Sequence, residues 1–319
     1  MPTLILSPRH TPNSQKLWRV AIDQEWDVIR LPSFRTPVEW EKNPPEDPVL
    51  YGEPLFNTMV ADALGLEIDT PPDDFLIQIG RNFSGRHVQL LTVSEARSID
   101  KPTFFKPPLH KTFKAGVYES GLALPDSLEK DELVLCQDVV RWIDEYRFFV
   151  LDGYIKAESC YINTEKFVGD STGEANRFFM QSARELVKKM LTRCRVLLPR
   201  AVVIDAGIYV DKDTQDYLPA IIEANEAPAS GLYQCEPEAV LQVLKNATRN
   251  PRGKVSNTLS PNDMKPGRQC PGKVVSAITG QIVHFTDGTV IQWIAATTPT
   301  YPTYDWKYVV EPPAYKVPN

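Results

Sequence analysis

Hydrophobic and polar positions alternate in short segments along the first part of the chain, and turn residues separate these segments. The pattern predicts strands at Thr3–Leu6 and Asp27–Leu31, and helices around Ser14–Gln24 and at Leu55–Leu64. Gly65 is expected to end the second helix, because glycine readily takes the left-handed conformation that follows a last helical turn. Strand–helix–strand order with short links predicts a small α/β lead-in lobe over residues 1–100.

From Lys101 onward the pattern is typical of β-hairpins. Further strands are predicted at Phe104–Lys106, Leu133–Val140, Glu145–Leu151 and Tyr154–Tyr161. Asp152 and Gly153 lie between the last two strands and are a strong signal for a two-residue turn, since both accept positive φ angles. We therefore expect these two strands to form a hairpin.

Longer elements follow this hairpin. The pattern predicts a long helix, a strand pair and a closing helix: Glu174–Cys194, Ala201–Val210 with Leu218–Asn225, and Pro237–Ala247. Residues 248–272 are polar, with Pro, Gly and Asn, which is typical of a linker. Residues 273–319 alternate like a small β meander with a turn at Asp287–Gly288. The predicted fold class is α+β: the lead-in lobe, a core over residues 101–247, the linker and a small β-rich C-terminal tail.

Composition narrows the function classes. The chain is 42% hydrophobic and 24% charged, an ordinary globular composition that argues against disorder, collagen and coiled coil. No apolar run reaches the length of a membrane span, and the first residues lack a signal-peptide pattern. The 5 cysteines are scattered without a CxxC pair, which argues against a zinc site or a disulfide framework. We therefore expect a cytoplasmic protein with no membrane partner.

The net charge of −6 is concentrated at the start of the chain. Residues 1–100 hold 9 Lys and Arg against 15 Asp and Glu, and the remaining residues are balanced. Nucleic-acid affinity comes mainly from neutralised phosphates, so this acidic first third argues against a nucleic-acid partner. The balanced remainder can still contain a local basic pocket.

Acidic residues interrupt both strands of the second predicted pair. If Val210 faces Leu218, antiparallel pairing places Asp205 opposite Glu223, with Asn225 on the same face. Carboxylates directly opposite each other are destabilising unless something lies between them, and Mg²⁺ bound to nucleotide phosphates prefers such oxygen ligands. The alternative is that these are surface acids on a solvated face. The apolar neighbours on both strands leave little room for a plainly alternating surface strand, which favours the metal site.

Lysines surround a glycine-containing loop upstream. Lys106, Lys111 and Lys114 lie close together before Gly116. Ammonium groups and backbone N–H groups are what a triphosphate requires of a protein. A solvated basic loop is the plainer alternative, and the spacing differs from that of a P-loop.

Arg147 is expected to share a strand face with Glu145 and Phe149. A structural ion pair is one interpretation. The other is that the guanidinium group faces a phosphate or an acyl-phosphate, whose oxygens match its fork of donors.

Three segments together resemble a known family: FFKPPLHKTFKAGVY, RWIDEYRFFVLDGYI and IIEANEAPASGLY. They are similar to a divergent clade of the ATP-grasp superfamily, which contains phage and bacterial proteins and the eukaryotic assembly factor for translation initiation factor 2. The Asp205 strand with Glu223 and Asn225 is also similar to the metal-binding hairpin of D-alanine–D-alanine ligase-like enzymes. The resemblance covers about residues 50–235. It implies an ATP-grasp fold, in which two α+β lobes clamp ATP.

The resemblance also implies a role for each candidate residue. Lys106 and either Lys111 or Lys114 would face the phosphates, and Arg86 and Arg147 would face the phosphate or the intermediate. A hinge between the lobes would read adenine through its backbone: Cys136, Gln137, Asp138 and Val139. The Mg²⁺ ligands would be Asp205, Glu223 and Asn225. The usual long glycine-rich phosphate loop is short here, so the choice between the two loop lysines stays open.

The implied function is an ATP- and Mg²⁺-dependent ligase, in which ATP phosphorylates a carboxylate and an amine attacks the acyl-phosphate. Its partner would be a peptide, a protein or a small amino or carboxyl compound. The alternative is a non-catalytic ATP-binding assembly factor or chaperone for a partner protein, like the eukaryotic relative. An RNA ligase or a kinase is disfavoured, because the chain has neither a KxDG nor a P-loop motif.

Overall fold

The computed structural model describes residues 1–108, 112–163 and 174–249, and beyond them only a set of short strands. Lys111 and the predicted turn at Asp287–Gly288 lie outside the described residues. Contacts divide the chain into two units, Met1–Asn250 and Pro251–Asn319.

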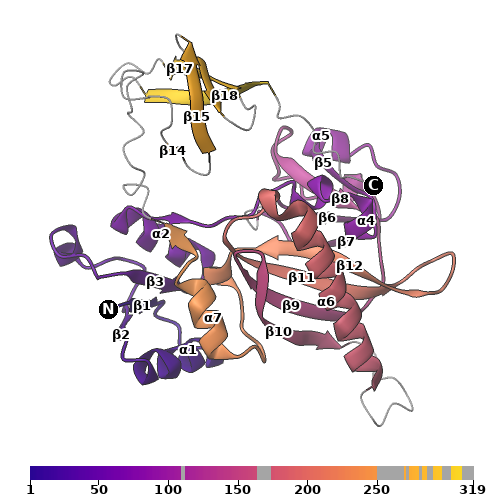
Figure 1. Cartoon of the computed structure of the whole chain (residues 1–319). Helices are drawn as coiled ribbons and strands as arrows, with labels where there is room; N and C mark the ends of the chain where they lie inside the picture. Colours follow the sequence, from indigo (N-terminus) through magenta and orange to yellow (C-terminus); the bar gives the residue numbers. More distant parts are fainter. Residues whose placement is uncertain are drawn as a thin grey trace. The chain divides into compact units, whose positions relative to one another are not determined.

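The lead-in lobe is a small parallel sheet with two helices (Figure 1). Its strands, in the order β2-β1-β3, and its helices are β1 (Thr3–Leu6), β2 (Asp27–Arg30), β3 (Pro48–Tyr51), α1 (Pro12–Asp23) and α2 (Pro54–Leu64). Thr11 caps α1, because its hydroxyl accepts a hydrogen bond from the backbone N–H of Ser14. Gly65 ends α2 at φ 65°, as predicted. The sequence analysis missed only β3 among these elements, since Pro48 begins it.

A second, antiparallel sheet follows, in the order β5-β8-β6-β7. Its strands are β5 (Val88–Thr92), β6 (Thr103–Lys106), β7 (Gly116–Tyr118) and β8 (Leu133–Gln137), and short helices accompany them at α3 (Phe75–Gln78), α4 (Arg81–Ser84) and α5 (Val93–Ala96). Because β5 pairs with β8, this sheet takes in residues before position 100, where the predicted lead-in lobe ends. We name it the small sheet.

The central sheet has the order β10-β9-β11-β12. It consists of β9 (Trp142–Leu151), β10 (Tyr154–Asn163), β11 (Ala201–Val210) and β12 (Tyr217–Asn225), with α6 (Glu174–Cys194) across one face (Figure 1). The predicted hairpin between β9 and β10 is confirmed, with φ 53° at Asp152 and 79° at Gly153.

Alternation along the strands divides the central sheet into two differently used faces. On one face, Tyr146, Phe148 and Ile204 are buried in one core with residues of α6. On the other face, Phe149 and Val203 are buried with the lead-in lobe and with α7 (Pro237–Leu244). Arg147 and Asp205 belong to this second face, so the lead-in lobe covers part of the face that carries the candidate site.

Two further features concern the end of the chain. β13 (Thr248–Arg249) pairs with β4 (Glu67–Ile68), so the start of the predicted linker belongs to the first unit. The second unit contains an antiparallel sheet whose strands follow chain order: β14 (Gln269–Cys270), β15 (Lys273–Thr279), β16 (Ile282–Phe285), β17 (Val290–Ala296) and β18 (Thr303–Val310). Of the helices in the described residues, none has the length and apolar character that crossing a membrane requires.

Candidate functional site

A bulge in β12 sets the geometry of the candidate site. At the loop end Val210 pairs with Tyr217, so the predicted pairing with Leu218 is wrong by one residue. The register then shifts, and Ile222 is the extra residue on β12. Beyond this bulge Asp205 does face Glu223, as predicted.

Arg147 forms a buried ion pair with Asp205, its cross-strand neighbour. Its Nε donates to Oδ1 of Asp205 at 2.8 Å and its Nη2 donates to Oδ2 at 2.7 Å. Burial raises the pKa of Asp205 to about 6, against the opposing effect of the guanidinium group. Burial acts to lower the pKa of Arg147, but the hydrogen bond to Asp205 outweighs it and the net shift is upward. The pair is two-pronged, as expected of guanidinium and carboxylate groups.

Lys106 on β6 reaches across to Glu223 on β12. Its Nζ lies 2.5 Å from Oε2 of Glu223. Burial acts to raise the pKa of Glu223, but the charge and hydrogen bond of Lys106 outweigh it, so the carboxyl pKa is lowered. This contact joins the small sheet to the central sheet at the predicted metal ligands.

Asn225 links the two carboxylates. Its Nδ2 donates to Oδ2 of Asp205 and to Oε1 of Glu223, both at 3.0 Å. The three predicted metal ligands are therefore brought together. No group of three His, Cys, Asp or Glu side chains suited to a metal occurs among the described residues. Two carboxylates and one amide fit Mg²⁺ nevertheless, because this ion takes one or two protein carboxylates and completes its shell with water and phosphate oxygens.

Two tyrosines that the sequence analysis missed lie against Arg147. The Cζ atom of Arg147 is 5.3 Å from the ring centre of Tyr161 and 5.1 Å from that of Tyr233, and the two rings stack 4.9 Å apart. Nη1 of Arg147 also donates to the carbonyl of Gly231 at 3.2 Å. The Tyr161 hydroxyl donates to Glu145, whose pKa is raised by burial. No local pattern marks these tyrosines, since one follows a bulge in β10 and the other lies beyond β12.

The predicted hinge connects the small sheet to the central sheet. Cys136 and Gln137 end β8, and Asp138 and Val139 follow on the way to β9. The backbone N–H of Asp138 donates to the carbonyl of His87 at 3.1 Å, and the Asp138 carboxylate accepts from the backbone N–H of His87 at 3.1 Å. Burial raises the pKa of Cys136 to about 11, which agrees with a packing role for this thiol.

Arg86 is almost fully enclosed, with 4% of its surface exposed. Nε donates to Oε1 of Gln137 at 2.8 Å, and Nη1 donates to the carbonyls of Ser84 at 2.7 Å and Ile221 at 2.8 Å. Nη2 donates to the carbonyl of Ile222 at 3.0 Å. Burial lowers its pKa to about 10. Four of its five N–H donors are thus satisfied by protein groups, and a phosphate contact stays a prediction.

Lys114 is exposed, and its carbonyl accepts a hydrogen bond from the Tyr118 hydroxyl at 2.7 Å. Lys106 is therefore the one predicted phosphate lysine that the described residues bring to the acids.

A protein-family comparison matches residues 83–243 to an ATP-grasp domain family, family 2 of its clade. The chain belongs to this family. The resemblance drawn from the sequence is thereby confirmed, and so is the α+β ATP-grasp fold. A search of the curated proteins finds no match.

Solved structures with this ATP-grasp fold are distant in sequence. D-alanine–D-alanine ligase from Bacillus anthracis, complexed with ATP, is 14% identical and aligns over 77% of this chain and 97% of its own, with a TM-score of 0.47. The ATP-grasp ligase PsnB with its minimal precursor, Mg and ADP is 11% identical over 76% of this chain and 96% of its own, with a TM-score of 0.45. A RimK domain ATP-grasp protein from Sphaerobacter thermophilus DSM 20745 is 11% identical over 77% and 98%, with a TM-score of 0.47.

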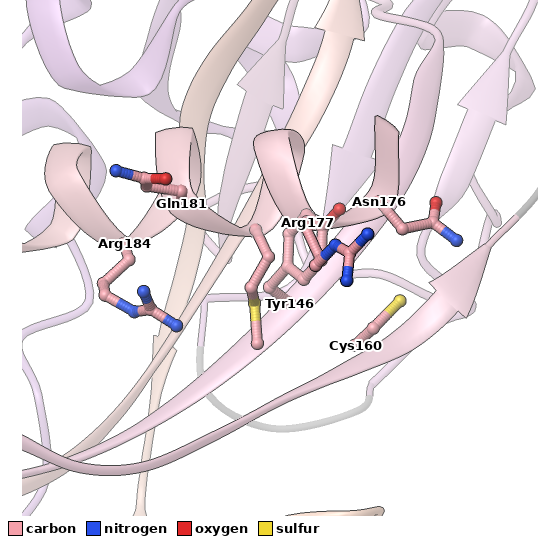
Figure 2. Close-up of a pocket in the computed structure, with 7 residues that line it drawn as sticks. Tyr146, Cys160, Asn176, Arg177, Gln181 and Arg184 are labelled. Carbon is pink, nitrogen blue, oxygen red and sulfur yellow. The ribbon is translucent and has the colours of Figure 1, made fainter. Parts of the chain in front are cut away.

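The ATP-grasp core also contains a cavity of about 480 Å³ between α6 and the central sheet. Figure 2 shows Arg177, Gln181 and Arg184 of α6 beside Tyr146 and Cys160 of the sheet. Tyr146 precedes Arg147 on β9, so the two side chains point to opposite faces. The cavity is therefore separated from the candidate site by the thickness of the sheet.

Proposed function

We propose that this ATP-grasp protein is an ATP- and Mg²⁺-dependent ligase that joins a carboxylate to an amine and releases ADP and phosphate. The observation that carries the proposal is the continuous cluster from Lys106 through Glu223, Asn225 and Asp205 to Arg147. Its cations and carboxylates come from two different sheets, as a nucleotide held between two lobes requires.

In this proposal the nucleotide lies between the small sheet and the central sheet. The backbone of the hinge residues Cys136–Val139 contacts adenine, and Lys106 contacts the phosphates together with Lys111 or Lys114. Lys106 then exchanges its Glu223 partner for a phosphate oxygen. An ammonium group paired with a carboxylate is already desolvated and aimed, which lowers the cost of that exchange.

Asp205, Glu223 and Asn225 would hold the Mg²⁺ ion, which would offset negative charge on the transferred phosphoryl group. Asn225 now donates through Nδ2, and rotation of its side-chain amide would present Oδ1 instead. Glu223 needs only to lose Lys106 to become a ligand.

Arg147 would orient the phosphoryl group or the acyl-phosphate. Three of its five N–H groups are used by Asp205 and Gly231, so two remain for an oxygen anion. Because Asp205 and the stacked tyrosines hold the guanidinium group, its donors are preorganised before the substrate arrives. The substrate carboxylate oxygen attacks the γ-phosphorus and ADP leaves. The amine nitrogen then attacks the acyl carbon, phosphate leaves and the amine loses a proton.

The substrates that we propose are a peptide, a protein or a small compound with an amino or carboxyl group. The test is a screen for ADP release with pooled amino acids and dipeptides, followed by mass measurement of the products. Amine-dependent ADP release with a product one water lighter than its two precursors is expected. ATP binding without turnover under all conditions would contradict the ligase and favour an assembly factor.

A further inference from the structure

We propose that Arg86 is a positioning residue, which holds the bulge at Ile222 and thereby keeps Glu223 on the same face as Asp205. The role in nucleotide and metal binding rests on the proposed function, whereas the role in strand register does not. Arg86 contacts neither phosphate nor substrate in this account.

The bulge is needed because Ile221 and Glu223 must point in opposite directions. Ile221 is fully buried in the core beneath α6. Glu223 lies opposite Asp205, on the face that carries Arg147. Residues two apart on a regular strand share one face, so a regular β12 could not satisfy both positions. The extra residue Ile222 reverses the alternation between them.

A bulge leaves backbone groups without ladder partners, and Arg86 supplies the missing donors here. Nη1 binds the carbonyl of Ile221 at 2.8 Å and Nη2 binds the carbonyl of Ile222 at 3.0 Å. These are the carbonyls on either side of the extra residue. Sequence separations of 135 and 136 residues make both contacts tertiary, so local sequence around β12 does not encode them.

Other contacts hold the guanidinium group in this place. The Trp142 ring centre lies 5.3 Å from the Cζ of Arg86. A Cβ atom at Gly207 would come within 2.8 Å of the Trp142 ring and 2.9 Å of the Ile222 side chain. Only glycine lets both groups lie directly over β11 at this point. The bulge, the indole and Arg86 therefore form one packed unit.

The remaining contact of Arg86 reaches the hinge. Nε donates to Oε1 of Gln137, on the strand that leads into the hinge. One side chain thus links the adenine side of the proposed site to the strand of Glu223. Groups that orient ligating side chains commonly change metal affinity by about 10- to 100-fold when they are removed.

Arg86→Lys tests the proposal, because lysine keeps the charge but cannot reach three carbonyls and an amide at once. Arg97→Lys is the matched control: Arg97 also donates to two carbonyls, those of Leu124 and Pro125, at 3.2 and 2.8 Å. Two quantities are measured on the full chain. One is hydrogen exchange of a peptide spanning residues 218–226 without nucleotide. The other is the Mg²⁺ concentration that half-saturates the enhancement of ATP binding, beside ATP affinity in EDTA.

We expect faster exchange in β12 and an increase of about tenfold or more in the Mg²⁺ requirement for Arg86→Lys, with at most about a threefold change of ATP affinity in EDTA. The control should change neither quantity. Unchanged exchange in Arg86→Lys would overturn the register role. An equal loss of ATP affinity with and without Mg²⁺ would show a phosphate contact instead and overturn the positioning role.

Gln137→Met covers the case in which Arg86→Lys does not fold. It removes one acceptor while leaving Arg86 in place, and the same two changes are expected at smaller size. Wild-type exchange and Mg²⁺ dependence in this variant would overturn the proposal. If the wild-type chain bound no Mg²⁺ and ATP, the proposed function would fail, and the exchange measurement would still decide the register role.

Discussion

Lys106 Nζ lies 2.5 Å from Glu223 Oε2, and this ion pair connects β6 of the small sheet to β12 of the central sheet across 117 positions of sequence. Both side chains are partly buried. Two groups proposed for different ligands, phosphate and metal, therefore neutralise each other when neither ligand is bound.

Lys106→Gln should weaken ATP binding by about tenfold or more, because a hydrogen bond from a charged donor contributes roughly 1.5–3 kcal/mol. Lys245→Gln is the control, since Lys245 pairs with Asp47 at 3.3 Å on an exposed surface. Equilibrium binding of a fluorescent ATP analogue measures both. Equal affinities of the two variants would contradict a phosphate role for Lys106.

Asp205→Asn and Glu223→Gln should both abolish ADP release but differ in stability. Asp205 is buried with Arg147, so its loss leaves a buried cation without its partner and costs about 3–5 kcal/mol. Glu223 is more exposed and pairs with a flexible lysine, so Glu223→Gln should cost less than about 1 kcal/mol. Urea denaturation measures the difference. Similar stability losses would contradict the burial argument, and wild-type turnover in either variant would remove that residue from the site.

Arg147→Lys keeps the charge and loses the two-pronged geometry toward Asp205. Turnover should fall by about 100-fold or more at a temperature where the variant is still folded, as for other preorganised donors. Arg184→Lys is a suitable control, because Arg184 makes a comparable pair with Glu158 on the α6 side. A folded, fully active Arg147→Lys protein would show that Arg147 has only a structural role.

Residues 251–319 form a separate unit by their contacts, so a chain ending at Gly253 should keep ATP affinity within about twofold. The end point retains β13, which pairs with β4 of the first unit. Calorimetric titration with ATP and Mg²⁺ measures the affinity. An insoluble truncated chain, or one that no longer binds ATP, would show that the tail belongs to the core.

Much of the fold was predictable because its signals are local. Helical periodicity predicted α6 with its observed bounds, and Asp152–Gly153 predicted the hairpin turn. The pairing of Asp205 with Glu223 was predicted from a loop register that is one residue off, and the bulge at Ile222 compensates for the difference. No local pattern encodes that bulge, since Arg86 stabilises it from a distant segment.

Other parts of the site depend entirely on tertiary packing. The resemblance singled out Lys106 and Glu223, but their direct contact arises from the way the two sheets face each other. Tyr233 lies beyond β12 with φ 53°, a conformation that sequence periodicity does not predict for tyrosine. Its stacking on Tyr161 against Arg147 was therefore not anticipated.

The most direct measurement is calorimetric titration of ATP into the wild-type chain and into Glu223→Gln, each with Mg²⁺ and with EDTA. The wild-type chain should bind ATP with Mg²⁺ and gain roughly 2.7 kcal/mol of stability at about a hundredfold excess over its dissociation constant. Glu223→Gln should retain binding in EDTA and lose most of the enhancement by Mg²⁺. No binding by the wild-type chain, or an equal Mg²⁺ enhancement in both proteins, would contradict the assignment of this cluster as the nucleotide and metal site.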